Sequence, residues 1–303
     1  MSFENYLIEY TGIMQEVMKE TYKKYPVETE MLFEFIDNWI DLIPKDKEKF
    51  FQATNSLSGI ILLNSWKLTN WISYEILIGK YFEAIRNLRF VFEGSLFALI
   101  IEDAIESRVF EKWGSLSSLS LKAEVFRLWE ECRKRKICKK GKINRNKVNK
   151  LVVDFVNQNI DLSRSNDARE YIEVYKKILS NEKLYLSTGQ MIDESVSFLK
   201  LDKKDIEEVK KLWHDLSRYL HFSYPSLEVI AEDPEFCFLE KLNDELFKRS
   251  LILYFQTLDF FYATLVWRFK NLRKEIEVIC EWWRKNFNKK FSLTEKTLNR
   301  VKE

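Results

Sequence analysis

The stretch LRFVFEGSLFALII, from Leu88 to Ile101, decides the fold of this chain. Apart from Arg89 and Glu93, every residue in it is apolar or small. A helix that is apolar nearly all round its surface has to be covered by other helices on every side. We therefore expect a helix from Tyr81 to about Trp113 to lie at the centre of a helical bundle, packed against the later helix from Asp202 to Phe222.

The composition of the whole chain indicates the same fold class. Of its 303 residues, 46% are hydrophobic and 15% aromatic, which is enough for a well-filled core. Only 7 Gly and 4 Pro interrupt the chain, and this scarcity favours long uninterrupted helices over a sheet fold with many turns. The sequence predicts an all-α protein, a multi-helix bundle of about ten to thirteen helices.

Breaks in the apolar pattern divide the chain into three parts. We expect N-terminal helices over residues 1–45, a helical core over 46–232 with a basic insertion at about 133–150, and long C-terminal helices over 233–303 that pack on the core. Gly79 separates two helices of the core. Other expected helices are 3–22, 28–42, 44–78, 121–136, 147–158, 166–179 and 191–199, with a Ser-rich loop at 114–120 and a short extended piece at 184–187.

Charge and cysteine usage give the expected environment. With 49 basic and 47 acidic residues, the net charge of +2 predicts no overall attraction to nucleic acid or membrane. Cys132, Cys138, Cys237 and Cys280 form no close pair, which indicates reduced thiols and a cytoplasmic protein. We expect neither a signal peptide nor a membrane span, because the most apolar stretch, Ser250 to Trp267, fits a buried core helix. Abundant Lys, Glu and Ile are typical of a thermophile.

Both histidines of the chain lie on the helix expected at 202–222. His214 and His221 are seven residues apart, so a helix places them on one face, with Arg218 between them and Ser217 beside it. Asp202, followed by Asp205, is a typical N-terminal helix signal.

Arg89 and Glu93 interrupt the apolar central helix. They are four residues apart and can pair along the helix, and full burial requires further partners from another helix. Two interpretations stay open. In one, these groups join the histidine helix in a polar network that holds the register of the core. In the other, His221 is a general acid or base oriented by Glu93, and Arg89 or Arg218 holds an anionic group.

The segment from Arg133 to Lys150 holds ten Lys or Arg and no acid. Such a segment can bind the phosphates of RNA, and a solvated loop is the alternative interpretation. No aromatic residue lies within it, so it offers no stacking platform. The candidate nucleic-acid ligands are Arg133, Lys134, Arg135, Lys136, Lys139, Lys140, Lys142 and Arg145.

The sequence predicts no metal site and no cofactor. A helical di-iron site uses Glu-x-x-His pairs, and the chain has none. P-loop, dinucleotide-binding and Gly-x-Ser-x-Gly signatures are also missing. His214 followed by Asp215 is the dipeptide of His-Asp phosphohydrolases, but that site uses another histidine upstream, and the chain has none.

Two segments resemble the HEPN-like all-helical families. The first is Gly79 to Arg89, followed by Glu93, and the second is the Leu-Ser-x-x-x-His element at Leu216 to Ser223. The similarity covers roughly Trp66 to Leu227, with the basic segment as an insertion.

This resemblance implies a metal-independent ribonuclease with an Arg-x(4–6)-His motif, often at a dimer interface. His221 would then activate a ribose 2′-hydroxyl, and an arginine would stabilise the phosphorane. Here Arg218 precedes His221 by only three residues, which departs from the motif. The equally supported alternative is a HEPN-like protein without demonstrable ribonuclease activity.

Three functions follow from these features. The first is an RNA-binding protein, with metal-independent cleavage if it is an enzyme, in a defence or stress context. The second is a non-enzymatic interaction protein, a homodimer formed through Phe- and Trp-rich C-terminal helices such as the one with Trp282 and Trp283. The third is a nucleotide pocket on Arg86, Arg89 and Arg218.

Overall fold

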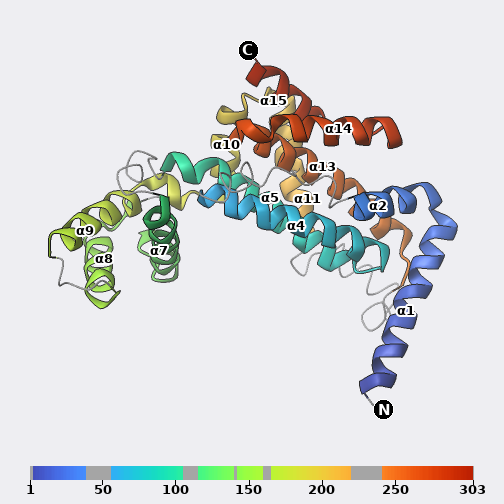
Figure 1. Cartoon of the computed structure of the whole chain (residues 1–303), viewed down its shortest axis with the longest axis horizontal. Coiled ribbons are helices and arrows are strands. Elements are labelled where there is room, and N and C mark those ends of the chain that lie inside the picture. Colours follow the sequence, from blue (N-terminus) through green and yellow to red (C-terminus); the bar gives the residue numbers. More distant parts are fainter. Residues whose placement is uncertain are drawn as a thin grey trace.

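The computed structural model describes residues 3–38, 56–104, 115–139, 142–159, 165–219 and 241–302. These residues form an all-α bundle with one two-stranded antiparallel hairpin, so the predicted fold class is confirmed. Figure 1 shows a body of packed helices and a smaller lobe built from α7, α8 and α9 at one side.

The described residues form the following helices and strands in chain order. In the first half they are α1 (Phe3–Lys24), α2 (Pro26–Asn38), α4 (Leu57–Leu77), α5 (Tyr81–Ala104), α7 (Ser115–Lys134), α8 (Arg145–Asn159) and α9 (Ser165–Leu179), with strands β1 (Cys138–Lys139) and β2 (Lys142–Ile143) between α7 and α8. The second half contains η1 (Glu182–Tyr185), α10 (Thr188–Leu199), α11 (Lys203–Arg218), α13 (Asp244–Arg268), η3 (Lys270–Leu272), α14 (Arg273–Phe287) and α15 (Ser292–Lys302).

Helix α5 lies at the centre of the body, as its sequence predicts. It packs most extensively against α4 and α13, and also against α10 and α11. Leu88, Phe92, Leu96 and Leu99 are fully buried in the large hydrophobic cluster of the body. The main neighbours of α5 are therefore α4 and α13, and the histidine helix packs on it less extensively.

Two glycines let α4 and α5 lie close together. Gly79 has a φ of +82°, a conformation that glycine adopts without strain, and it makes the turn between the two helices. Gly94 faces α4, where an added Cβ would lie 3.2 Å from the Ser65 hydroxyl oxygen and 3.3 Å from a methyl of Ile61. The turn at Gly79 confirms the expected interruption, and Gly94 lets α4 approach α5 closely.

Two predicted boundaries are wrong. The Ser-rich stretch expected as a loop at 114–120 is helical from Ser115 onward, because it continues into the apolar spacing of α7. The stretch from Leu184, expected to be extended, ends a 3₁₀ turn at Tyr185 whose first residues are capped by the Asn181 side chain. The basic segment, expected to be a loop or a helix end exposed to solvent, contains the exposed end of α7 and start of α8, and the hairpin between them was not predicted.

Helices α13, α14 and α15 cover the body from one side (Figure 1). Most of α13 is buried, which confirms the core helix expected from Ser250 to Trp267. Trp283 of α14 is fully buried among Phe35, Phe255 and Phe291. Trp283 therefore lies in the hydrophobic core of the body. Among the described residues, no helix has the length and apolar character needed to cross a bilayer.

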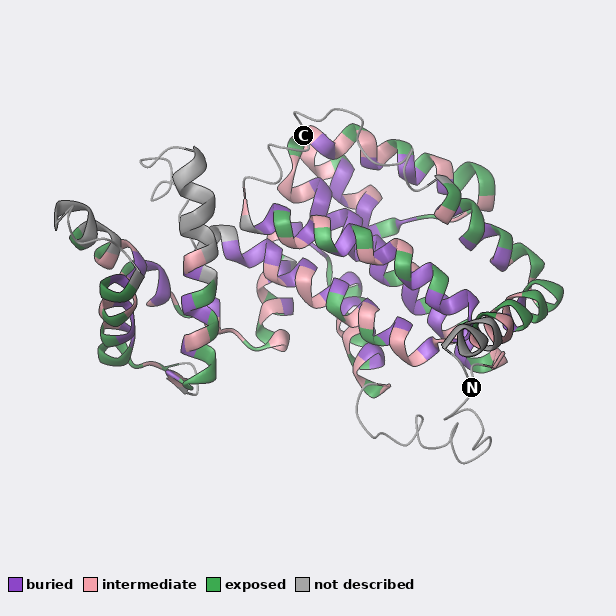
Figure 2. Ribbon diagram, turned by 60° about the horizontal axis from the view of Figure 1, so that its bottom comes forward, coloured by how far each residue is buried: buried purple, intermediate pink, exposed green. Residues whose placement is uncertain are grey.

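The lobe of α7, α8 and α9 has a hydrophobic cluster of its own. Figure 2 shows its buried residues apart from those of the body. Val152, Val156 and Tyr175 lie at its centre, and Trp129 donates its indole N–H to the Leu184 carbonyl at 2.8 Å. Phe97 and Ile101 at the end of α5 join this cluster, so α5 connects the lobe to the body.

Candidate functional site

Helix α11 begins and is oriented as the sequence predicts. Asp202 accepts a hydrogen bond from the Asp205 N–H, and the Asp205 side chain accepts one from the Asp202 N–H, which completes a capping box. Lys296 of α15 pairs with both carboxylates, at 3.2 and 2.5 Å, and holds the N-terminus of α11 against the C-terminal helix.

The residues expected to act at the other end of α11 are only partly described. His214 and Arg218 are exposed, and the Ser217 hydroxyl donates to the Trp213 carbonyl. His221 lies outside the described residues, so its position relative to Glu93 and Arg218 stays a prediction. Exposure of His214 agrees with a position on the solvent face of this helix.

Arg89 and Glu93 form the expected ion pair along α5. Arg89 Nε donates to Glu93 Oε1 at 2.8 Å. Their side chains are 23% and 36% exposed, so the expectation that they are buried and depend on partners from another helix is wrong. Because water reaches both groups, the pair is satisfied on its own helix and contributes little to stability.

The histidine helix has two buried charges, Asp205 at its N-terminus and Asp215 near its other end. The Asp215 side chain is 11% exposed, and it pairs with Arg249 of α13 at 2.6 Å. Asp215 lies three residues after Leu212 and next to Leu216, which are both buried, so helical spacing places it on the apolar face of α11. That spacing was the signal in the sequence, but it does not identify Arg249 as the partner.

The candidate nucleic-acid ligands gather at one end of the lobe. The last turn of α7, the hairpin and the first turns of α8 present exposed cations, and we call this surface the basic tip. Lys139 lies in β1, but its side chain is not described, and Lys140 lies outside the described residues. The exposed cations of the basic tip are Arg133, Lys134, Arg135, Lys136, Lys142, Arg145, Lys147 and Lys150.

Local hydrogen bonds hold the backbone of the basic tip in place. Ile137 N–H donates to the Cys132 carbonyl at 3.0 Å across Lys136, whose φ is +49°, and so closes the end of α7. Asn144 N–H donates to the Ile137 carbonyl at 3.1 Å, and the Asn144 side chain accepts from the Lys147 N–H at the start of α8. The cations therefore project from a structured scaffold.

Few acids compensate this charge. Glu131 forms two ion pairs. Its Oε1 lies 3.4 Å from Lys134 Nζ, and its Oε2 lies 3.5 Å from Arg135 Nε. The Arg133 guanidinium lies over the Trp129 ring at 5.0 Å from its centroid. The positive end of the α8 dipole adds to the potential of the side chains.

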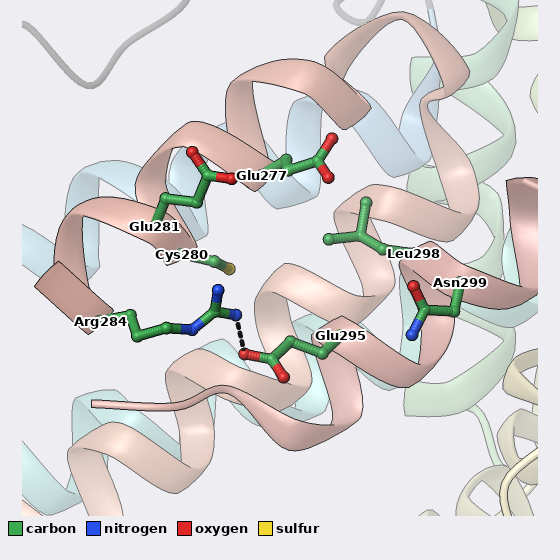
Figure 3. A pocket seen from close by; sticks show the side chains of 7 residues that line it. All are labelled: Glu277, Cys280, Glu281, Arg284, Glu295, Leu298 and Asn299. Carbon is green, nitrogen blue, oxygen red and sulfur yellow. Dashed lines mark hydrogen bonds and ion pairs between the residues drawn. The ribbon is translucent and has the colours of Figure 1, made fainter. Parts of the chain in front are cut away.

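A small cavity of about 230 Å³ lies between α14 and α15, and Figure 3 shows its lining. Arg284 and Glu295 pair across it. Burial, together with nearby Asp259 and Glu295, raises the pKa of the Cys280 thiol, so this thiol stays protonated and is a poor nucleophile. The lining residues are Glu277, Cys280, Glu281, Arg284, Glu295, Leu298 and Asn299.

Within the described ranges, no group of three or more His, Cys, Asp or Glu side chains is arranged to hold a metal ion. Comparisons with family models, with curated proteins and with solved structures find no match to this chain.

Proposed function

We propose that the chain binds RNA through the basic tip of the α7–α9 lobe. The observation that carries the proposal is the set of eight exposed cations on three consecutive elements, with Glu131 as their paired acid. Neutralising phosphates with such cations releases counterions, which supplies affinity without regard to sequence. The net charge of the whole chain is only +2, so the local surface rather than the whole molecule attracts the ligand.

The lobe contacts phosphates rather than bases. Among its side chains that the structure describes, no large hydrophobic group is exposed, and Trp129 is buried in the lobe core. Base stacking needs exposed rings, so binding at this surface has weak sequence preference and strong salt dependence.

The test compares two triple variants with the same change in net charge. Arg135, Lys142 and Arg145 are changed to Gln together, and affinity for a labelled single-stranded RNA is measured by fluorescence anisotropy at several salt concentrations. Each phosphate contact contributes roughly 0.7 to the slope of log affinity against log salt, so we expect the slope to fall by about two. The control changes Lys203, Lys204 and Lys211, which are exposed on α11, and should keep the wild-type slope.

Equal weakening by both triple variants, or none by the first, contradicts the proposal. The same samples also test the cleavage that the HEPN resemblance implies. RNA that is cut in the presence of EDTA, and left intact by His221→Ala, adds a metal-independent ribonuclease to the binding function. RNA that is bound but stays intact assigns binding alone.

A further inference from the structure

The solvent side of the α4–α5 pair carries three exposed aromatic rings. Trp71 and Tyr74 on α4 are 58% and 41% exposed, and Phe90 on α5 is 54% exposed. The largest apolar patch of a monomer covers about 300–600 Å² and is often a contact surface. Trp and Tyr are also the residues that most often dominate the energy of protein interfaces.

The rings lie at one level of the helix pair. Glu75 of α4 accepts two hydrogen bonds from the Asn87 side chain of α5, at 2.8 and 2.9 Å. Ser65 lies next to Gly94, so the two helices run antiparallel. Trp71 is one turn before Glu75, and Phe90 is one turn after Asn87. Trp71 and Phe90 therefore lie at the same level of the helix pair, one on each helix.

Hydrogen bonds and stacking hold this surface in a defined shape. The Trp71 indole also hydrogen-bonds to Glu75, which is buried below the rings. Trp71 and Tyr74 are stacked, with 6.3 Å between ring centroids and 12° between ring planes. A contact surface that is already ordered loses less conformational entropy when a partner binds.

The charges around the rings are of both signs. Lys67 and Arg86 are exposed, and Glu83 and Glu93 are half-buried beside them. Both Glu83 and Arg86 lie close enough to act electrostatically on Glu75. A nucleic acid binds to a surface whose charges are all positive, such as the basic tip. A two-fold axis places the same surface against itself, so a surface that carries both signs around an apolar centre can bring each charge opposite one of the other sign.

We infer that this aromatic face, made of Trp71, Tyr74 and Phe90 with their charged neighbours, binds the same face of a second copy of the chain. A stable dimer buries about 800 Å² on each partner. Three half-exposed aromatic side chains supply on the order of 300 Å² of this. The polar rim of Lys67, Glu83 and Arg86 surrounds them, as in other interfaces.

The test is the mass of the chain in solution, measured by light scattering after size exclusion over a wide range of protein concentrations. The wild type should give twice the 36.6 kDa chain mass. Trp71→Glu and Phe90→Glu place unpaired charge at the centre of the interface, so each should raise the dimer Kd by about a hundredfold or more. Both positions are exposed in the monomer, and circular dichroism checks that the variants stay helical.

Ile252→Glu on α13 and Val278→Glu on α14 are the matched controls, since these side chains are 51% and 60% exposed away from this face. They should leave the dimer intact. A wild-type monomer at every concentration overturns the inference. A dimer that both face variants retain, or that the controls also lose, overturns it as well. If Trp71→Glu abolishes RNA binding while the mass stays unchanged, RNA occupies the face and a second copy does not.

Discussion

Gly79 makes the turn that brings α5 back along α4. At its φ of +82°, a side chain is strained, and an added Cβ would lie 3.0 Å from the Lys241 carbonyl oxygen and 3.2 Å from a methyl of Val17. The position therefore excludes a side chain twice over, by conformation and by contact.

Gly79→Ala should lower the free energy of unfolding by about 1–3 kcal/mol, because both the strain and the backbone contact act in the folded state alone. Urea denaturation followed by circular dichroism measures this. The matched control is Gly12→Ala in α1, where an added Cβ meets nothing within 4 Å and helix propensity favours alanine. Equal stability of the two variants would show that the turn tolerates a side chain.

At the scale of the element, α15 depends on a residue of another helix for its N-terminal cap. Asp259 of α13 accepts hydrogen bonds from the N–H groups of Leu293 and Thr294, at 3.0 and 2.9 Å, and from the Thr294 hydroxyl at 2.8 Å. These N–H groups have no partner within the first turn of α15, so the carboxylate replaces a local capping residue.

Burial raises the pKa of Asp259 to about 6, although the hydrogen bonds from residues 292–294 oppose this. The unfolded value is near 3.8, so between these two values the folded state binds the proton more tightly than the unfolded state. Stability from this group is therefore fully present below about pH 4 and is lost as the pH rises through about 6. The change is on the order of 2–3 kcal/mol.

Asp259→Asn should remove this pH dependence, which thermal unfolding between about pH 4 and 7 measures. Asp202→Asn is the contrasting variant, because hydrogen bonds from the Asp205 N–H and from Lys296 lower the pKa of Asp202. The stability that Asp202 contributes is present above its unfolded pKa and is lost as the pH falls. The slope of stability against pH that Asp202→Asn removes therefore has the opposite sign to the slope that Asp259→Asn removes. An unchanged profile for Asp259→Asn would show that another group titrates.

At the scale of the whole molecule, each of the two proposed binding surfaces lies over its own hydrophobic cluster. The body cluster supports the aromatic face of α4 and α5, and the lobe cluster supports the basic tip. Helix α5 takes part in both clusters, because Phe97 and Ile101 near its end join the lobe cluster.

Val152→Asp places a charge in the lobe core, where the wild-type side chain is fully buried. We expect α7, α8 and α9 to lose protection from hydrogen exchange, while α4, α5 and α13 keep theirs. RNA affinity should fall, and the dimer mass should stay. Val209→Asp, in the body cluster, is the control and should remove protection throughout the body. Loss of protection throughout the body in Val152→Asp would show that the two clusters unfold as one unit.

Much of the fold could be predicted because its signals are local. The apolar run at 88–101, the break at Gly79 and the capping pair Asp202 and Asp205 each depend on neighbours within about one helical turn. The Arg89–Glu93 pair was predictable for the same reason. The Ser-rich start of α7 was missed because serine favours loops on its own, while the apolar spacing that follows it favours a helix.

The partners of the buried polar groups could not be predicted. Asp215 pairs with Arg249, which lies 34 residues later in the sequence. Glu75 accepts from Asn87, 12 residues later. Asp259 caps α15 about 34 residues later. Spacing shows that a polar residue lies on an apolar face, but it does not show which residue lies opposite.

The sequence by itself determined that this chain is helical, that two of its helices are separated at Gly79, and which helix is central, because backbone conformation and apolar periodicity depend on adjacent residues. Only the tertiary structure decided that Trp283 is covered and Trp71 is not, and that exposed cations gather on a lobe with its own core. Exposure depends on how distant helices pack against one another, and that packing is a property of the whole chain.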